Sequence, residues 1–360
     1  MTVVGLSGCS ESAQRGSPGF ALLSGPDGIS ITSGSEPRIL SEFRQVQGFG
    51  PVASLVWADV GTAIVLADET IAIVDSEGVA RSQPCPDCIG VAAEGGALFT
   101  ARVNYRPGDG FDIVELNMNL DEVRSVPAAR LVERASRVQL DESGPPRIRA
   151  VTVDSIYVSY GARTAGARHG PGILAQHSRT GELTGYAVID GLIFDMAVSP
   201  DGRYAAIIAG GSGGACNTSA DLRVVELTGM TLLETWQDLP LDPDTAARTG
   251  QWFFAHDLRW VDGRVEVAGQ LFDPPRGGSC DENPVEWTRT FDVERQEFSD
   301  EKSQELHNRK AIGPTCDDVI AYSNLHPYAH GTVVTVREGR ESVVAEDARI
   351  LGATSGGLEC

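Results

Sequence analysis

The chain has 360 residues, of which 50 are Asp or Glu and 29 are Lys or Arg, so its formal net charge is −21. A molecule this acidic repels phosphate backbones, which excludes a general nucleic-acid binder. Hydrophobic residues make up 41% of the chain, which excludes wholesale disorder, and no apolar run approaches the roughly 18 residues of a membrane-spanning helix.

The first informative segment is Leu6-Ser7-Gly8-Cys9, followed by the polar stretch Ser10 to Pro18. Small residues before a cysteine suit cleavage by a signal peptidase, and the segment resembles the lipobox of bacterial lipoproteins. The resemblance implies a diacylglycerol on Cys9 and an extracytoplasmic, membrane-anchored lipoprotein of a bacterium. Because Met1 to Val4 lack a basic region, either translation starts upstream or the match is accidental. We expect residues 1–18 to be a truncated signal followed by a flexible tether.

From Phe20 onward, short apolar strands alternate with turns rich in Gly, Asp and Pro. Three strands between Phe20 and Phe43 lack an inner partner, and one strand at Ala348–Gly352 lacks followers, so together they complete one four-strand unit. Helix-like patches are expected at 242–249 and 300–308. The other four-strand units are expected at about 51–84, 88–128, 145–190, 193–238, 255–300 and 310–346.

These units predict an all-β fold in which residues 19–360 form one seven-bladed β-propeller, with the N- and C-terminal strands sharing a blade and closing the ring. The segment Val198-Ser199-Pro200-Asp201-Gly202 places Pro and Gly where a tight hairpin needs them. It resembles the corresponding turn of bacterial TolB-like and WD-repeat-like β-propellers. That resemblance implies the architecture and says nothing about a ligand.

Six cysteines remain after Cys9, an even number that suits three disulfides in an oxidising compartment. A bridge between the two neighbouring loops that carry Cys216 and Cys280 is expected, and a bridge between Cys316 and Cys360 would hold the ring closed. The six are Cys85, Cys88, Cys216, Cys280, Cys316 and Cys360.

The segment Cys85-Pro86-Asp87-Cys88 has three interpretations: a local disulfide, a redox pair or half of a zinc site. A redox pair usually lies at a helix N-terminus, whereas these flanks are strand ends. A zinc site needs a second pair of ligands at suitable spacing, and none is evident. The local disulfide is therefore favoured.

Three other segments match catalytic or metal-binding patterns in the wrong context. Gly210 to Gly214 fits G-x-S-x-G, but a strand rather than a helix follows, so a flexible glycine loop is predicted. His326 and His330 have helical metal-binding spacing, but Pro327 places them on a loop. His256-Asp257 is expected to precede an inner strand and lacks a serine partner. We therefore predict no catalytic set, no metal site and no cofactor.

Loops between second and third strands are expected to be short in the first two units and long in the other five, as at Asn104–Gly110 and Asn324–Gly331. In propellers these loops lie on the face that usually binds ligands, and long loops often carry function. The predicted ligand-binding rim comprises Tyr105, Arg106, Arg168, His169, Arg276, His326, Tyr328 and His330.

The sequence does not identify an activity. We favour a non-catalytic, monomeric propeller that binds a small ligand or a protein at the cell envelope and touches the membrane only through its lipid. The alternatives are a secreted hydrolase or lyase with its active site at the propeller mouth, and a cytoplasmic interaction scaffold.

Overall fold

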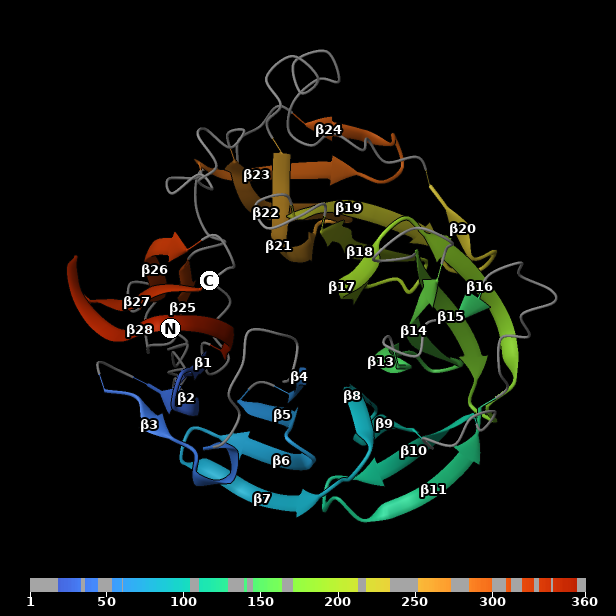
Figure 1. Ribbon diagram of the computed structural model, residues 1–360, viewed down its shortest axis with the longest axis horizontal. Helices are drawn as coiled ribbons and strands as arrows, with labels where there is room; N and C mark the ends of the chain where they lie inside the picture. Colours follow the sequence, from blue (N-terminus) through green and yellow to red (C-terminus); the bar gives the residue numbers. More distant parts are fainter. Residues whose placement is uncertain are drawn as a thin grey trace, which may run out of the picture.

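A computed structural model describes residues 19–33, 36–44, 54–59, 61–103, 110–128, 139–140, 145–163, 171–212, 218–233, 252–272, 285–299, 309–311, 319–326, 330–337 and 339–354. Both predicted helix-like patches lie outside these residues. In the described part, no helix is long and apolar enough to cross a membrane. Figure 1 shows β-sheets arranged around a common centre, as in a β-propeller.

Two sheets are four-stranded antiparallel meanders that match the units expected at 51–84 and 88–128. In each, the first strand lies nearest the centre and the fourth lies outermost (Figure 1). The strands of the first sheet are β4 (Ser54–Asp59), β5 (Thr62–Ala67), β6 (Thr70–Asp75) and β7 (Gly78–Pro84). The strands of the second sheet are β8 (Cys88–Glu94), β9 (Ala97–Val103), β10 (Phe111–Asn117) and β11 (Glu122–Pro127).

The next three meanders repeat this arrangement, and a single parallel pair, Ala220 with Phe254, joins the second of them to the third. The first comprises β13 (Arg147–Val151), β14 (Ser155–Arg163), β15 (Gly172–Ser178) and β16 (Leu183–Ile189), with β12 (Gln139–Leu140) added to β14. The second comprises β17 (Leu192–Val198), β18 (Tyr204–Ser212), β19 (Thr218–Glu226) and β20 (Thr231–Leu232). The third comprises β21 (Trp252–Val261), β22 (Arg264–Phe272), β23 (Val285–Asp292) and β24 (Glu297–Ser299).

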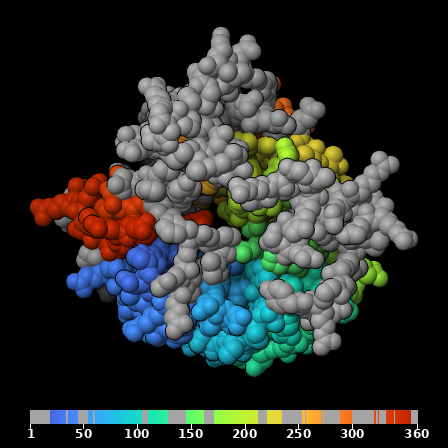
Figure 2. All heavy atoms as spheres, viewed as in Figure 1, coloured from blue at the N-terminus to red at the C-terminus, as the bar shows by residue number. Residues whose placement is uncertain are grey.

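The last strand of the chain pairs with the first, as the sequence predicted. β28 (Arg340–Thr354) has 15 residues, and its first half pairs with β27 while its second half pairs with β1. Figure 2 shows the N-terminal residues, in blue, beside the C-terminal residues, in red. The other elements of this sheet are β25 (Arg309–Ala311), β26 (Val319–His326), β27 (His330–Arg337), β1 (Phe20–Gly25), β2 (Gly28–Thr32) and β3 (Arg38–Ile39), followed by the 3₁₀ helix η1 (Ser41–Phe43).

The hydrophobic core lies between the faces of consecutive sheets. Ile64 on β5 packs toward the sheet of β8 to β11, whereas its neighbour Val65 packs toward the sheet of β1 to β3. In the same way, Ile207 and Ile208 on β18 enter the two clusters on opposite faces of their sheet. Strands buried on both faces are apolar throughout rather than alternating, which explains the very apolar second strand of each unit.

A recurring hydrogen bond closes the turn between the third and fourth strands. In each case the last residue of the third strand accepts hydrogen bonds from backbone N–H groups of the turn, such as Glu77 N to Asp75 Oδ1 at 2.8 Å. This is the local side-chain-to-backbone bond that polar residues use in turns. The residues concerned are Asp75, Asn117, Ser178, Glu226 and Asp292.

The turn predicted around Ser199 to Gly202 is confirmed between β17 and β18. The hydroxyl of Ser199 donates to Asp201 Oδ1 at 2.6 Å and accepts from the N–H of Tyr204 at 2.9 Å. The Ser199 hydroxyl thereby holds the pKa of the exposed Asp201 carboxyl below its usual value. Gly202 has a φ of 71°, which glycine adopts readily.

The predicted glycine loop after β18 is only partly correct. Gly210, Gly211 and Ser212 continue β18 and pair with Ala220, Ser219 and Thr218 on β19. Hydrogen bonds to β19 keep the two glycines in the strand, so β18 is longer than its glycine content predicts.

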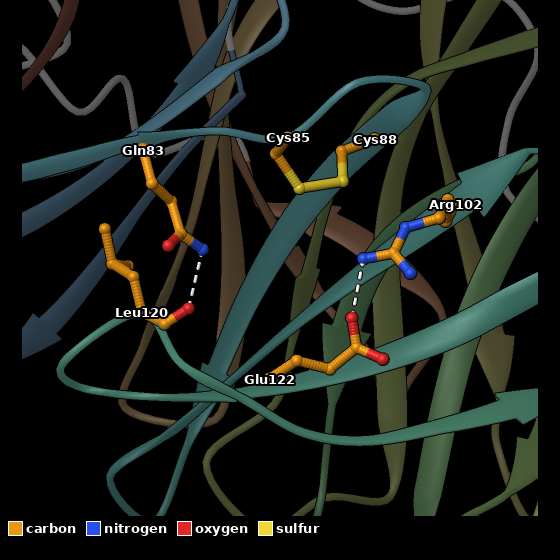
Figure 3. Close-up of a disulfide and its surroundings, with 6 residues drawn as sticks. All are labelled: Gln83, Cys85, Cys88, Arg102, Leu120 and Glu122. Atoms are coloured by element: carbon orange, nitrogen blue, oxygen red, sulfur yellow. Dashed lines mark hydrogen bonds and ion pairs between the residues drawn. A yellow bond between two sulfur atoms is a disulfide. The ribbon is translucent and has the colours of Figure 1, made fainter.

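The expected local disulfide joins Cys85 to Cys88 in the connection between β7 and β8 (Figure 3). The N–H of Cys85 also donates to the carbonyl of Glu69 at 2.6 Å, and the N–H of Val103 donates to the carbonyl of Asp87 at 2.9 Å. The disulfide therefore holds the connection between β7, the outermost strand of one sheet, and β8, the innermost strand of the next.

We predict that Gly90→Ala destabilises the fold much more than Gly96→Ala. Both glycines have positive φ, at 74° and 79°, so either alanine costs about 1 kcal/mol of backbone strain. A Cβ at Gly90 would also lie 2.4 Å from the carbonyl oxygen of Ile148 on β13, whereas Gly96 has nothing within 4 Å. The additional clash should cost about 1–3 kcal/mol. Urea-unfolding midpoints measure both, and equal midpoints would contradict the close packing of β8 on β13.

Candidate functional site

Five strands near the centre, β8, β13, β17, β21 and β28, each contain a β-bulge. A bulge inserts one residue opposite the partner strand and changes the direction of side chains, and bulges are frequent beside active sites. The register shifts place the extra residue at Gly90 on β8, Arg149 on β13, Phe194 on β17, His256 on β21 and Leu351 on β28.

Arg149 connects the bulge of β13 to the bulge of β17. Its guanidinium donates to the hydroxyl of Ser159 at 2.8 Å, to the carbonyl of Phe194 at 2.9 Å and to the carbonyl of Ile193. Burial among the inner strands, together with the nearby charge of Arg147, lowers the pKa of Arg149 to about 9. Arg149 is therefore still charged at neutral pH, and it fixes the backbone that presents Phe194 and Asp195.

Asp195, an exposed residue, follows Phe194 on the inner strand β17. Its Oδ1 accepts a hydrogen bond from the N–H of Met196 at 2.8 Å. Poor hydration at this crowded position raises the pKa of Asp195, and the neighbouring charge of Asp257 on β21 acts in the same direction. Arg149 and Arg349 act in the opposite direction, so charged groups on three other strands, β13, β21 and β28, influence this carboxyl.

An aromatic surface lies beside these charges. Phe194 is 39% exposed, and its ring centroid is 6.5 Å from that of Phe254 on β21. We call the set Arg149, Phe194, Asp195, Asp257 and Arg349 the inner-strand site. It combines both signs of charge with an apolar surface, which is the composition of a small binding site.

His177 is a titratable group with a structural role instead. Its side chain on β15 is fully buried and lies edge to face against Phe111 on β10. Nδ1 lies 3.3 Å from the carbonyl of Gly181, and Nε2 lies 3.2 Å from the hydroxyl of Tyr160. A carbonyl only accepts, so Nδ1 carries the hydrogen and Tyr160 donates to Nε2. Burial lowers the pKa of His177, which keeps the ring neutral and away from any ligand.

Most of the predicted rim lies outside the described residues, including Tyr105, Arg106, Arg168, His169, Arg276 and Tyr328. The same holds for Cys9, Cys216, Cys280, Cys316 and Cys360. Among the described residues, no three His, Cys, Asp or Glu side chains come together as metal ligands would.

Two predictions about histidines are corrected by the strand bounds. His326 ends β26 and His330 begins β27, where they are directly paired, so the long loop expected at Asn324–Gly331 contains only residues 327–329. His256 and Asp257 lie within the inner strand β21 rather than before it. Hydrogen bonding to a partner strand makes these strands longer than the nearby Pro and polar residues predict.

The sequence analysis did not single out Arg149, Phe194, Asp195 or Arg349. Each charged residue interrupts an apolar inner strand, as in Ile148-Arg149-Ala150 and Ala348-Arg349-Ile350. An ionisable residue inside such a strand is the signal that finds them, because it needs a functional or structural partner.

No family profile and no curated protein matches the chain. Solved structures with a similar arrangement include dihydro-heme d1 dehydrogenase NirN in complex with DHE, at 14% identity and a TM-score of 0.47 over 97% of this chain and 77% of that one. BamB from Moraxella catarrhalis has 11% identity and a TM-score of 0.40, over 81% and 86% of the two chains. The luciferin-regenerating enzyme has 12% identity and a TM-score of 0.40, over 82% and 94%. These values support no statement about family or activity.

We predict that Asp195→Asn stabilises the protein at neutral pH and not in acid. A carboxyl whose folded-state pKa is raised favours the folded state below its unfolded pKa, near 3.8, and loses this contribution as pH rises through the folded value. The amide side chain of the variant does not ionise, so the variant does not lose this stability as pH rises. Melting temperatures of wild type and variant should therefore diverge as pH rises from about 4 to 7. A constant difference across this range would contradict the raised pKa.

Proposed function

We propose that the chain forms a closed ring of seven four-stranded blades. Five blades correspond to the meanders from β4 to β24. The sixth comprises β25 to β27 with the first half of β28, and the seventh comprises the second half of β28 with β1 to β3. The antiparallel pairing of Leu22 with Gly352 and of Ala21 with Ala353 supports this assignment.

We further propose that the protein is a non-catalytic binding propeller whose ligand contacts the inner-strand site. The convergence of Arg149, Asp195, Asp257 and Arg349 from four inner strands supports this function. Groups held by separate strands of a rigid sheet array are preorganised for recognition. Arg149 is engaged by backbone carbonyls of β17, so it acts as a positioning residue.

The predicted rim is proposed as a second part of the same binding face, with Arg106, His169 and His330 as its main contacts. A partner protein at the cell envelope or a small ligand fits this arrangement, with the protein acting as a monomer. Charged and aromatic groups at the centre and at the rim would then contribute specificity.

One observation favours a second candidate, a secreted hydrolase or lyase. Asp195 and Asp257 are neighbouring carboxyl groups, and the pKa of Asp195 is raised. Two carboxyl groups with different pKa values are the usual acid and base of such enzymes. In that case the ligand would be converted at the inner-strand site instead of being retained.

Binding at this site predicts a variant-dependent loss of partner recovery. Tagged wild-type protein should retain its partner from envelope extracts, and either Asp195→Asn with Arg349→Gln or the triple alanine variant at Arg106, His169 and His330 should lose most of it. Arg340→Gln, an exposed arginine near the other end of β28, is the matched control and should retain the partner. Equal recovery by all variants would refute both parts of the proposed face.

Lipidation of Cys9 would anchor the protein at the outer face of a bacterial membrane, where Cys216, Cys280, Cys316 and Cys360 would be oxidised. Intact mass of the protein from its host, measured after alkylation without reduction, should show a diacylglycerol adduct and no alkylated cysteine. An unmodified Met1 terminus with alkylated cysteines would instead support the cytoplasmic scaffold.

A further inference from the structure

The two cysteines of the local disulfide differ in their access to solvent. Cys85 is 4% exposed and is buried in the apolar cluster between the sheets of β5 and β9. Cys88 is partly exposed, and Pro86 and Asp87, which lie between the two cysteines, are exposed. A reagent in solvent therefore meets Cys88 first.

A positive charge lies opposite Cys88. The register pairs Cys88 on β8 directly with Arg102 on β9, and the Cβ atoms of directly paired residues lie about 5 Å apart on one face of the sheet. Arg102 is partly exposed and forms an ion pair with Glu122, with 2.8 Å between Nη2 and Oε2 (Figure 3). A nearby arginine stabilises a thiolate. Arg102 therefore favours both an attacking thiolate and the Cys88 thiolate that reduction releases.

The disulfide reinforces a set of backbone hydrogen bonds at one end of the sheets. The N–H of Cys85 donates to the carbonyl of Glu69 at 2.6 Å, the N–H of Cys88 donates to the carbonyl of Cys85 at 3.2 Å, and the N–H of Val103 donates to the carbonyl of Asp87 at 2.9 Å. Glu69 lies between β5 and β6, and Val103 ends β9. The disulfide therefore lies at the same end as the connections between second and third strands, the end where the sequence predicts the binding face.

The bulge at Gly90, two residues after Cys88, brings β8 against the next inner strand. A Cβ at Gly90 would lie 2.4 Å from the carbonyl oxygen of Ile148 on β13, so the two backbones are in direct contact. The next residue, Arg149, donates hydrogen bonds to two backbone carbonyls of β17. A contiguous series of contacts therefore joins the disulfide to the inner-strand site.

We propose that the Cys85–Cys88 disulfide is a redox switch for the inner-strand site and that its reductant is a dithiol. In the oxidised state, the disulfide holds the start of β8 and, through Gly90, the position of β13. In the reduced state only hydrogen bonds hold this connection, so β8 and β13 open more often and the site loses its fixed geometry. The regulation rests on the binding function proposed above, whereas the reaction of the disulfide does not.

Reduction takes place in two thiol–disulfide exchange steps. A thiolate of the dithiol attacks Sγ of Cys88, the bond between Cys85 and Cys88 breaks, and Cys85 leaves as a thiolate that takes up a proton. The second thiolate of the dithiol then attacks the dithiol sulfur that is bound to Cys88, and Cys88 leaves as a thiolate beside Arg102. The protein gains two electrons, and the dithiol is oxidised to its own disulfide.

The rate of reduction of the folded protein by dithiothreitol tests the reaction. Alkylation and mass spectrometry of the peptide that contains both cysteines separate this disulfide from the other cysteines. Arg102→Gln should slow the reduction about threefold, because it removes a positive charge and leaves Glu122 unpaired, and Glu122→Gln should accelerate it about threefold. Both effects should disappear in roughly 1 M salt.

Arg124→Gln is the matched control, because Arg124 forms a similar ion pair, with Glu115, in the same sheet. This variant should be reduced as fast as wild type, and thermal melts show that each variant is folded. Equal rates for wild type, Arg102→Gln and Glu122→Gln would overturn the proposal. Reduction that is no faster than global unfolding, measured in parallel, would also overturn it.

Hydrogen exchange followed by mass spectrometry tests the regulation. Reduction should speed the exchange of amides in β8 and β13 about tenfold and leave β23 unchanged. The double variant Cys85→Ser with Cys88→Ser should exchange as the reduced protein does and should not respond to dithiothreitol, which excludes an effect of the other cysteines. Unchanged exchange in β13 on reduction would show that the disulfide does not control the inner strands.

The partner recovery described above separates this proposal from the binding function. If the oxidised and the reduced protein retain the partner equally well, the binding function stands and the switch is wrong. If reduction speeds exchange in β13 and no partner is recovered in either state, the redox change of the inner strands stands and the binding function fails.

Discussion

The antiparallel pairing of β1 with the second half of β28 is the interaction on which the arrangement of sheets depends. The four sheets from β4 to β20 bury apolar residues on both faces, and a sheet of this kind without a neighbour would expose an apolar face and an unpaired edge. β28 pairs with β27 through its first half and with β1 through its second half, so one continuous strand covers the exposed edges of both. Phe20 on β1 then packs edge to face against Trp57 on β4, with ring centroids 5.4 Å apart, and so joins the first strands to the next sheet.

The same inner strands that support the packing also build the candidate site. The bulges at Arg149 and Phe194 each insert one residue opposite the partner strand, which bends the inner strand and changes the direction of its side chains. The extra residues bring polar groups toward strands of other sheets, where Arg149 satisfies carbonyls of β17. The same β-bulges therefore serve both the packing between inner strands and the formation of the inner-strand site.

Much of the fold follows from the sequence because alternation of apolar strands with Gly, Asp and Pro turns is a local signal. The bounds of the early units, the tight turn at Asp201 and the disulfide at Cys85 were predicted from such signals and are present. The inner-strand site was not predicted, because Arg149 and Arg349 are two hundred positions apart in the sequence and both influence Asp195 only through the arrangement of the sheets. Strand ends such as Ser212 and His326 were also missed, since hydrogen bonding to a partner strand outweighs local turn propensity.

The position of β28 at the far end of the chain has a consequence for biosynthesis. β1, β2 and β3 are synthesised long before β28, which pairs with the inner edge of β1. The hydrogen bond from Arg337 to the carbonyl of Ser33 likewise spans 304 positions. Contacts of this range form slowly, and unpaired apolar strands aggregate in the meantime. A truncation before Arg340 would therefore leave β1 paired with β2 but without its partner on the inner edge.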